Sequence, residues 1–353
     1  MTKKILCLID ALGPGGAERQ MAGLASMLKN NNYEVEVWYH EPKDFFVDEL
    51  KRHNINCRYF RGHKISKLLS IRKAIQEYQP NTVIAYLQSS SILVSAIRLS
   101  GIKFKLIVSE RNTNRTTSFR DVVRFNIFRV ADYIVPNSYS QATYIIVNFP
   151  FLSPKVKTII NFVDTDQFFH RIAERRNTII VAATIWKSKN VLGFIKAMKI
   201  LKDEGVLFHV KWFGKVKDQS GYLLECETLI RQLELNDEIE LLNKTHNIAE
   251  EYQDADYFCL PSFYEGTPNV ICEAMASGLP IICSNVCDNG RYVEDGVNGY
   301  LFNPKSIEDI ANTVQRMLSI SDGEYKDFCK ESRRKAVEMF SKKNFINNYL
   351  QLL

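Results

Sequence analysis

The stretch FYEGTPNVICEAMASGLPII, residues 263–282, holds the start and stop signals of one helix between two apolar strands. Gly266 and Pro268 break regular structure, and Pro268 suits a first helical turn because its missing N–H costs no hydrogen bond there. Helix-forming residues follow until Gly278, a typical stop residue, and a second apolar run then begins. The stretch therefore predicts a strand–loop–helix–strand unit with its helix over residues 268–276.

Short apolar segments rich in β-branched and aromatic residues recur along the whole chain, separated by segments with helical patterning. This alternation is typical of parallel sheets covered by helices on both faces. It stops and restarts near the polar segment 164–177, so we predict an α/β protein of two doubly wound, Rossmann-like domains. The predicted strands are 4–9, 35–39, 82–86, 105–108 and 133–135 in the first domain, and 179–183, 208–213, 239–242, 257–260 and 280–283 in the second.

The length and the helical patterns set the predicted domain bounds. A chain of 353 residues is too long for one ordinary core and suits two domains. We predict domains over residues 1–165 and 166–339, and a C-terminal helix at about 340–353 that can pack back on the first domain. The other predicted helices include 17–29, 65–79, 119–130, 190–202, 222–233, 268–276 and 307–318.

The composition argues against several classes of protein. No apolar stretch approaches the roughly 20 residues that a membrane-spanning helix needs. The N-terminal apolar run is short and is interrupted by Asp10, which favours a buried first strand over a signal peptide. The eight cysteines include no C-x-x-C pair, so we expect reduced core thiols rather than disulfides or a metal site. These features favour a cytoplasmic protein.

The net charge of +6 is spread unevenly along the chain. Residues 1–171 carry 24 basic and 14 acidic side chains, a net charge of +10, and the remainder carries −4. Residues 50–76 contain eight basic side chains and no acidic one. This basic segment is either a solvated face or a surface that meets anionic lipid or a phosphorylated acceptor. No recognition-helix, zinc-finger or RNA-binding pattern accompanies it, so we do not expect nucleic acid as a partner.

Two loops after predicted strands can hold an anion. The loop ALGPGG, residues 11–16, precedes a helix, and its glycines allow either close approach of a phosphate or simply a tight turn. It lacks the G-x-G-x-x-G pattern, which weakens the case for a nicotinamide cofactor. Lys187 and Lys189 follow the strand 179–183, where they can neutralise phosphates, although exposed loop lysines are also common.

Glu265 and Glu273 stand eight positions apart on either side of the predicted helix start. The amides of Asn269 and Val270 should point out of that helix start, where an anion is favoured. The Glu273 carboxylate can accept hydrogen bonds from a vicinal diol such as that of a ribose. The alternative for Glu273 is an exposed helical glutamate, but the pair with G-T-P between them favours a binding site.

The run E-G-T-P-N-x-x-x-E, followed by A-x-A-S-G-L-P-I-I, resembles the E-x7-E signature of the retaining GT-B glycosyltransferases of family 4. Further segments resemble that family in the same order: GPGGAER from Gly13, VPNSYS from Val135, IINFVDTDQF from Ile159 and RYVEDGVNGYLFNP from Arg291. The resemblance covers nearly the whole chain. It implies a GT-B fold, in which two Rossmann-like domains face an interdomain cleft.

The resemblance also implies roles for the matching residues. Glu265 and Lys189 would be the catalytic residues, Glu265 beside the donor sugar and Lys189 on its phosphates, with no metal ion and no other cofactor. Glu273 would hold the nucleotide ribose. The donor-binding residues would be Gly15, Gly16, Lys189, Glu265, Gly266, Thr267, Pro268, Asn269, Val270 and Glu273.

The chain departs from the family pattern at three places. Thr184 stands where the family usually has an arginine, a loss for which Lys187 could compensate. The family often has a histidine after the strand 105–108, whereas this chain has S-E-R-N-T-N-R, so Glu110, Arg111 and Asn112 are the acceptor-side candidates. The linker reads N-F-V-D instead of N-G-V-D.

The implied function is retaining transfer of a sugar from a nucleotide sugar, UDP-hexose or UDP-N-acetylhexosamine, in the synthesis of a cell-surface polysaccharide. The acceptor would be a glycan or a lipid-diphosphate-linked sugar, and residues 50–76 would place the protein peripherally on the inner face of the plasma membrane. One alternative is an inactive protein that binds a nucleotide sugar with the same fold. A nucleotide-sugar 2-epimerase and a dehydrogenase are less favoured, the latter because the dinucleotide fingerprint is missing.

Overall fold

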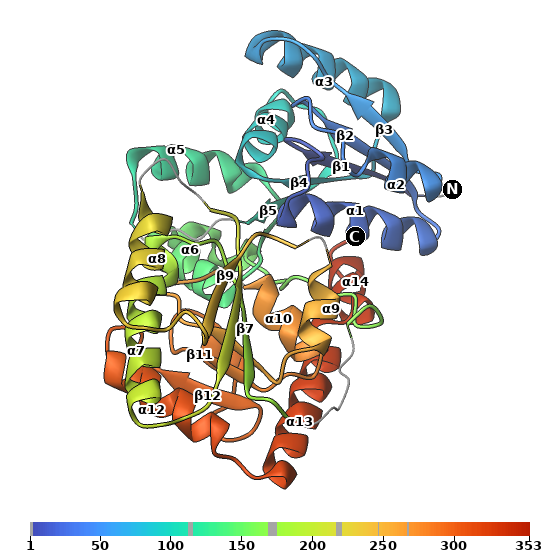
Figure 1. The fold of residues 1–353 in the computed structure, drawn as a ribbon. Coiled ribbons are helices and arrows are strands. Elements are labelled where there is room, and N and C mark those ends of the chain that lie inside the picture. The colour runs from blue at the N-terminus through green and yellow to red at the C-terminus, as the bar shows by residue number, and fades with distance from the viewer. Residues whose placement is uncertain (1–2, 112–115, 169–174, 217–220, 246, 267) are drawn as a thin grey trace. The chain divides into compact units, whose positions relative to one another are not determined.

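The computed structural model describes residues 3–111, 116–168, 175–216, 221–245, 247–266 and 268–353, which form two compact units (Figure 1). Unit 1 is Met1–Phe162 together with Lys342–Leu353, and unit 2 is Val163–Ser341. The ranges predicted from the sequence, 1–165 and 166–339, put the boundary a few residues further along the chain.

Unit 1 is built on a six-stranded, all-parallel sheet in the order β3-β2-β1-β4-β5-β6 (Figure 1). The strands are β1 (Lys4–Ile9), β2 (Glu34–Tyr39), β3 (Asn56–Tyr59), β4 (Thr82–Tyr86), β5 (Lys105–Glu110) and β6 (Tyr133–Pro136). The helices are α1 (Gly16–Asn30), α2 (Val47–Arg52), α3 (Lys64–Tyr78), α4 (Gln88–Leu99), α5 (Phe119–Ile127), α6 (Tyr139–Asn148) and α14 (Lys342–Leu350). Short 3₁₀ turns cover Phe128–Val130 and Pro150–Lys155.

Strand β1 shows why the sheet of unit 1 is buried on both faces. Successive strand residues point to opposite faces. Ile5 and Ile9 belong to an apolar cluster that also contains residues of α1 and α14. Leu6 and Leu8 belong to a second cluster, which contains residues of α3, α4 and α5. A continuous apolar strand is therefore required here, since each face packs against helices.

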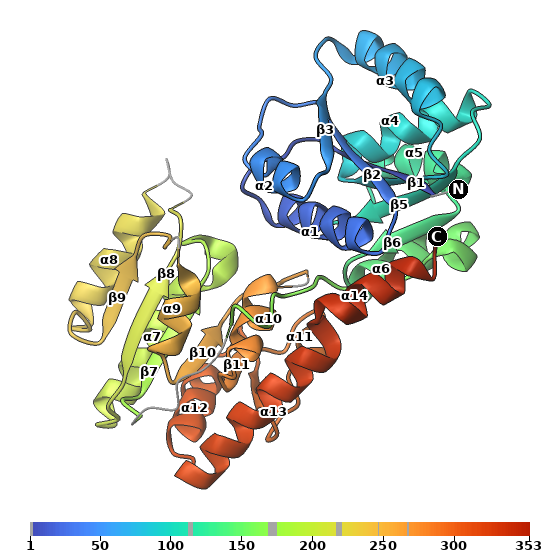
Figure 2. The same ribbon diagram turned by 90° about the vertical axis from the view of Figure 1, so that its right-hand side faces the viewer.

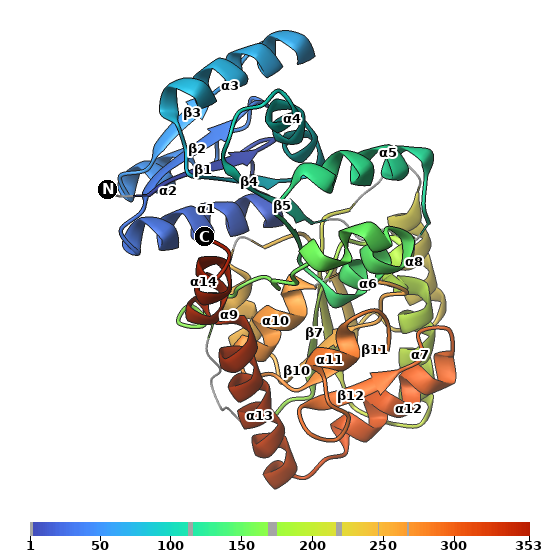
Figure 3. The same cartoon turned by 180° about the vertical axis from the view of Figure 1, so that it is seen from behind.

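The C-terminal helix α14 completes one of these two apolar layers. It lies beside α1, more than 300 positions away in sequence (Figure 3). The ring of Phe345 packs on Phe162 with 5.0 Å between centroids. The Tyr349 hydroxyl lies 2.8 Å from the hydroxyl of Tyr86 at the end of β4. Lys105 Nζ donates to the carbonyl oxygen of Leu353 at 2.9 Å.

Unit 2 contains a second six-stranded parallel sheet, in the order β12-β11-β10-β7-β8-β9 (Figure 2). Its strands are β7 (Thr178–Ala182), β8 (His209–Phe213), β9 (Ile239–Leu242), β10 (Tyr257–Leu260), β11 (Ile281–Ser284) and β12 (Gly299–Phe302). Its helices are α7 (Val191–Asp203), α8 (Tyr222–Gln232), α9 (Ile248–Gln253), α10 (Asn269–Ala276), α11 (Asn289–Tyr292), α12 (Ile307–Leu318) and α13 (Asp322–Phe340), with a 3₁₀ turn at Lys187–Lys189. The two sheets confirm the predicted class, a pair of doubly wound α/β domains.

The predicted helix at 268–276 begins one residue later than expected. Pro268 is the N-cap of α10 rather than its first helical residue, and its carbonyl accepts from Ile271 N at 3.0 Å. The predicted stop is confirmed, because Gly278 has φ +78° and donates to Met275 O at 2.9 Å. Strands β3 and β12 were not predicted. β3 has a largely exposed sequence, N-C-R-Y, at the edge of its sheet, so it lacks the apolar pattern of a buried strand.

The eight cysteines are free thiols, and six of them are buried. Burial raises the pKa of the Cys7 thiol to about 12, as expected for a side chain that packs in a core. Among the helices of the described residues, none combines the length and apolar character of a membrane span.

The packing of α14 predicts a measurable contribution to stability. Phe345→Ala should lower the free energy of unfolding by about 3–5 kcal/mol, because it leaves a cavity against Phe162. Lys343→Ala, an exposed position of the same helix, is the control and should change it by less than about 0.5 kcal/mol. Urea titrations followed by circular dichroism measure both values. Equal effects of the two substitutions would contradict the packing of α14 on unit 1.

Candidate functional site

Each sheet has one position where the strand order reverses. In unit 2 the chain runs from β7 outward through β8 and β9, and then returns to place β10 on the other side of β7. In unit 1 the same reversal separates β1 from β4. In open parallel sheets the loops beyond the carboxyl ends of the strands diverge at such a point and leave room for a ligand. The candidate site residues are therefore considered at these two switch points.

Lys189 and Glu265 meet at the switch point of unit 2. Lys189 ends the 3₁₀ turn that follows β7, and Glu265 lies in the loop after β10. Lys189 Nζ donates to Glu265 Oε1 in an ion pair whose side chains are 22% and 11% exposed. The same two loops are joined by Phe263 N, which donates to Ser188 O at 3.0 Å. The structure thus pairs the two residues predicted to be catalytic, which lie 76 positions apart.

The N-terminus of α10 comes a few residues after Glu265 and Gly266, at Asn269. The first amide of α10 that bonds back to Pro268 belongs to Ile271. The amides of Asn269 and Val270 precede it, in the first turn, where backbone N–H groups point out of a helix start. This end of the helix carries the positive part of its dipole, which favours a phosphate. Thr267, predicted as a donor-binding residue, lies outside the described residues.

Glu273 is buried within α10, with only 5% of the residue exposed. The neighbouring residues from Ile271 to Ala276 are also buried. The alternative of an exposed helical glutamate is therefore wrong. A buried carboxyl group is costly unless it is hydrogen-bonded. Helix propensity alone therefore does not explain why a glutamate stands at this position.

Lys187, which could compensate for the missing arginine, lies against an aromatic ring. Its Nζ lies over the ring of Tyr222 in α8, 6.0 Å from the ring centroid. Thr184, at the family's arginine position, lies in the segment between β7 and the 3₁₀ turn. Of the cations considered for phosphate binding, Lys189 is the one that the structure places against Glu265.

Gly15 and Gly16 mark the start of α1 in unit 1. Gly15 is the N-cap and Gly16 the first helical residue, one position earlier than predicted. The φ of Gly15 is −103°, which other residues also adopt, so its backbone conformation does not require glycine. A Cβ there would lie 2.2 Å from Oε2 of Glu18, so this carboxylate already lies against the helix start. The lack of a side chain at Gly15 leaves room for the Glu18 carboxylate to approach the backbone.

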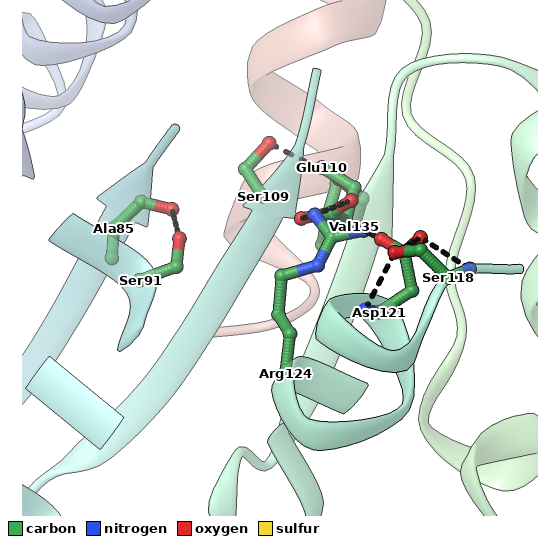
Figure 4. Close-up of polar contacts among 8 residues, drawn as sticks. All are labelled: Ala85, Ser91, Ser109, Glu110, Ser118, Asp121, Arg124 and Val135. Atoms are coloured by element: carbon green, nitrogen blue, oxygen red, sulfur yellow. Dashed lines mark hydrogen bonds and ion pairs between the residues drawn. The ribbon is translucent and has the colours of Figure 1, made fainter. Parts of the chain in front are cut away.

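Glu110, an acceptor-side candidate, ends β5 in a buried ion-pair cluster (Figure 4). Arg124 Nη1 donates to both its carboxylate oxygens, at 3.0 and 2.8 Å. Arg124 Nη2 donates to Asp121 Oδ1 at 2.8 Å, and Ser118 Oγ donates to Asp121 Oδ2 at 2.6 Å. Burial raises the pKa of Glu110, and the charge of Arg124 opposes this. Its carboxylate is engaged by Arg124, so the geometry favours a structural role.

Arg111, a second acceptor-side candidate, is held from three directions. Its guanidinium lies over the Tyr86 ring, 4.0 Å from the centroid. Nη1 donates to Asn161 Oδ1 at 2.6 Å, and Nη2 donates to the Tyr349 hydroxyl at 3.1 Å. Arg111 therefore links β4 and the linker to the C-terminal helix. Asn112, the third candidate, lies outside the described residues.

Sequence reasoning missed a polar cluster at the switch point of unit 1. Asp10 directly follows β1, His40 follows β2, and Ser90 lies in the first turn of α4. Asp10 Oδ1 accepts from Ser90 Oγ at 2.6 Å, and His40 Nε2 lies 3.1 Å from Ser90 Oγ. The available signal was a polar residue immediately after each of two predicted strands.

Comparisons with known proteins show the family and the fold of the chain. The profile described as "Glycosyl transferases group 1" matches residues 162–336, and "Glycosyltransferase Family 4" matches residues 14–167. The solved structure of Anabaena Alr3699/HepE in complex with UDP has a TM-score of 0.87 at 18% identity, covering 99% of this chain and 98% of that one. That similarity shows the fold, a two-domain GT-B architecture.

Two similar proteins come from Campylobacter jejuni. One is the N-acetylgalactosamine-N,N'-diacetylbacillosaminyl-diphospho-undecaprenol 4-alpha-N-acetylgalactosaminyltransferase, 25% identical over 303 residues, or 80% of this chain and 81% of that protein. The other is an alpha-1,4-N-acetyl-D-galactosaminyltransferase acting on GalNAc-alpha-(1->4)-GalNAc-alpha-(1->3)-diNAcBac-PP-undecaprenol, 23% identical over 369 residues, or 99% and 98%. Together with the profiles that match both halves of the chain, these similarities show that the protein belongs to the group 1 glycosyltransferases.

Proposed function

We propose that the protein transfers a sugar from a UDP-sugar to a lipid-diphosphate-linked glycan, with retention of configuration at the anomeric carbon. The observation that carries this proposal is the Lys189–Glu265 pair at the switch point of unit 2, next to the start of α10. At one sheet edge, the cation and the helix N-terminus can bind the diphosphate of a nucleotide sugar, and the carboxylate can bind its sugar. The inactive binding protein stays the alternative.

Lys189 and α10 would stabilise the leaving group. When the bond between the anomeric carbon and the phosphate oxygen breaks, negative charge develops on the nucleoside diphosphate. The Lys189 ammonium and the first amides of α10 are fixed donors for that charge, and such preorganised groups are effective in catalysis. These groups supply positive charge without a metal ion, so we propose a metal-independent reaction.

Glu265 would act through its charge rather than as a nucleophile. A double displacement requires a carboxylate that attacks the anomeric carbon. The ion pair with Lys189 stabilises the Glu265 carboxylate and so weakens it as a nucleophile. In the same-face route the acceptor oxygen bonds to the anomeric carbon as the phosphate departs, and the hydroxyl proton passes to the departing phosphate oxygen. Glu265 then needs only to hold the donor sugar and balance developing positive charge, so we favour this route.

The similar proteins suggest the substrate classes. Both Campylobacter enzymes are named for transfer of N-acetylgalactosamine to acceptors linked to undecaprenol through a diphosphate. The Anabaena protein was solved with UDP. We therefore propose a UDP-hexose or UDP-N-acetylhexosamine donor, with Glu273 at the ribose, and a role in polysaccharide synthesis at the cytoplasmic face of the membrane.

Helix α3 is the part of the basic segment best suited to a membrane surface. Ile65 and Leu69 are 74% and 59% exposed and lie one helical turn apart, with Lys64 and Lys73 exposed on the same helix. Exposed apolar side chains among lysines are typical of helices that bind anionic membranes. Not every basic residue of the segment takes part, because Lys67 Nζ donates to His40 O at 2.7 Å.

The two glutamates should separate binding from turnover. Glu273→Ala should raise the Kd for UDP by about 10- to 100-fold, because a charge-assisted contact to the ribose is lost. Glu265→Gln should lower kcat by about 10²- to 10³-fold with a smaller change in that Kd. Calorimetric titration with UDP and assays with a panel of UDP-sugars measure these effects, and exposed Glu225→Ala on α8 is the control.

The opposite pattern would reverse the two assignments. A wild-type protein that binds UDP but neither transfers nor hydrolyses any UDP-sugar would favour the inactive binding protein, for which Thr184 is the main argument. A protein that responds to no nucleotide sugar in thermal-shift assays would remove the basis of the proposed function.

The membrane surface can be tested by flotation with vesicles that contain anionic lipid. Lys64→Glu together with Lys73→Glu should weaken binding by at least about tenfold, because each lysine near such a surface contributes about 1 kcal/mol. The matched control is Lys326→Glu with Lys330→Glu, two exposed positions of α13 in unit 2. Equal flotation of the wild-type protein and both double variants would show that α3 is only a solvated face.

A further inference from the structure

The polar cluster of Asp10, His40 and Ser90 joins the segments that follow β1, β2 and β4 at the carboxyl edge of the sheet of unit 1. Asp10 Oδ1 accepts from Ser90 N at 2.7 Å and from Ser90 Oγ at 2.6 Å. His40 Nε2 lies 3.1 Å from Ser90 Oγ and 3.5 Å from Asp10 Oδ1. His40 is only 4% exposed, whereas 18% of the Asp10 side chain is exposed. The cluster is thus buried on one side and open at its carboxylate.

The hydrogen bonds fix the direction of the network. The single proton of Ser90 Oγ goes to Asp10, because that contact is the shorter one. Ser90 Oγ therefore accepts from His40 Nε2, which must carry a proton. The two donors of Ser90, its amide and its hydroxyl, converge on Oδ1 of Asp10. Among the described residues no donor contacts Oδ2, so this oxygen keeps its capacity to accept a hydrogen bond from a ligand.

The backbone at the same place is strained. Leu87, between β4 and α4, has φ +68° and ψ 163°, a region that only glycine adopts readily. It precedes Ser90 by three residues, and the bonds from Asp10 to Ser90 hold the start of α4. A helix cap alone accounts for Oδ1 and Ser90. Capping does not explain why His40 is buried there, nor why Asp10 Oδ2 at the switch point has no donor among the described residues.

The two units place their polar groups at equivalent points. Asp10 and Ser90 face each other across β1 and β4, as Lys189 and Glu265 do across β7 and β10. If unit 2 holds the donor, unit 1 is left to hold the acceptor. Glu110 and Arg111 are engaged in structural contacts, whereas Asp10 keeps a partly exposed carboxylate at the switch point of unit 1.

We infer that Asp10 is an acceptor-binding residue, whose Oδ2 accepts a hydrogen bond from a hydroxyl group of the acceptor sugar. This inference rests on the proposed function. The hydroxyl bound by Asp10 would be one that does not react, so that Asp10 orients the acceptor sugar while the proton of the attacking hydroxyl passes to the departing phosphate. Burial raises the pKa of Asp10, but the bonds from His40 and Ser90 outweigh it and hold the pKa below its usual range. An ionised carboxylate with a low pKa is a good hydrogen-bond acceptor and a poor base.

Asp10→Asn tests the inference with little change in shape. The amide oxygen can still accept both bonds from Ser90, while the amide nitrogen replaces Oδ2 and can only donate. The thermal midpoint should therefore stay close to that of the wild-type protein. Asp48→Asn, a 91% exposed carboxylate of α2, is the matched control. The probes are UDP alone, a panel of UDP-sugars, and synthetic N-acetylhexosamine and hexose acceptors, both free glycosides and lipid-diphosphate-linked.

In Asp10→Asn the KM for the acceptor should rise by about 10- to 100-fold, with the Kd for UDP, the KM for the donor and the slow hydrolysis of the UDP-sugar unchanged. A purely structural role would instead move the thermal midpoint and all constants together. An unchanged acceptor KM in an active protein overturns the inference, as does a wild-type protein that hydrolyses UDP-sugars but glycosylates no sugar acceptor. A wild-type protein that neither binds UDP nor hydrolyses a UDP-sugar overturns the proposed function instead, and the inference with it.

Discussion

Parallel strand pairing is the constraint on which both units depend. When every strand runs in the same direction, all strand-to-helix loops emerge at one edge of the sheet. The reversal of strand order then separates two neighbouring loops and leaves the space between them. Residues far apart in the sequence meet there, as Lys189 and Glu265 do in unit 2 and Asp10 and Ser90 do in unit 1. We propose that the chemistry of this glycosyltransferase is carried by side chains that the sheets bring to these points.

Buried charges near the same edges serve the fold. Arg124 neutralises Glu110 and Asp121 inside unit 1, where an unpaired charge would be costly. Arg111 links Tyr86 to Tyr349 and so fastens the C-terminal helix to the end of β4. The C-terminal helix α14 therefore belongs to unit 1, which also contains the first part of the chain. The position of a charged residue after a strand is therefore not enough to assign it to a substrate.

The sequence predicted the two-sheet architecture because strand and helix periods are local properties. It located ten of the twelve strands found in the described residues. Of the two that it missed, β3 is a polar edge strand, N-C-R-Y, which carries no apolar period. Residue types and spacing singled out Lys189, Glu265 and Glu273. Spacing does not show side-chain partners, so Glu110 was predicted on the acceptor side although Arg124 engages its carboxylate. The Asp10 cluster was missed because its three members follow three different strands, β1, β2 and β4, and lie far apart in the sequence.

The central claim is that unit 2 binds the nucleotide diphosphate at its switch point. Hydrogen exchange of the wild-type protein, measured by mass spectrometry with and without saturating UDP, tests this claim most directly. We expect UDP to slow exchange in the turn Lys187–Lys189 and at the start of α10, Asn269–Ala276, and to leave the basic helix α3 unchanged. Tight binding of UDP with no slowing of exchange in those two segments would contradict the account.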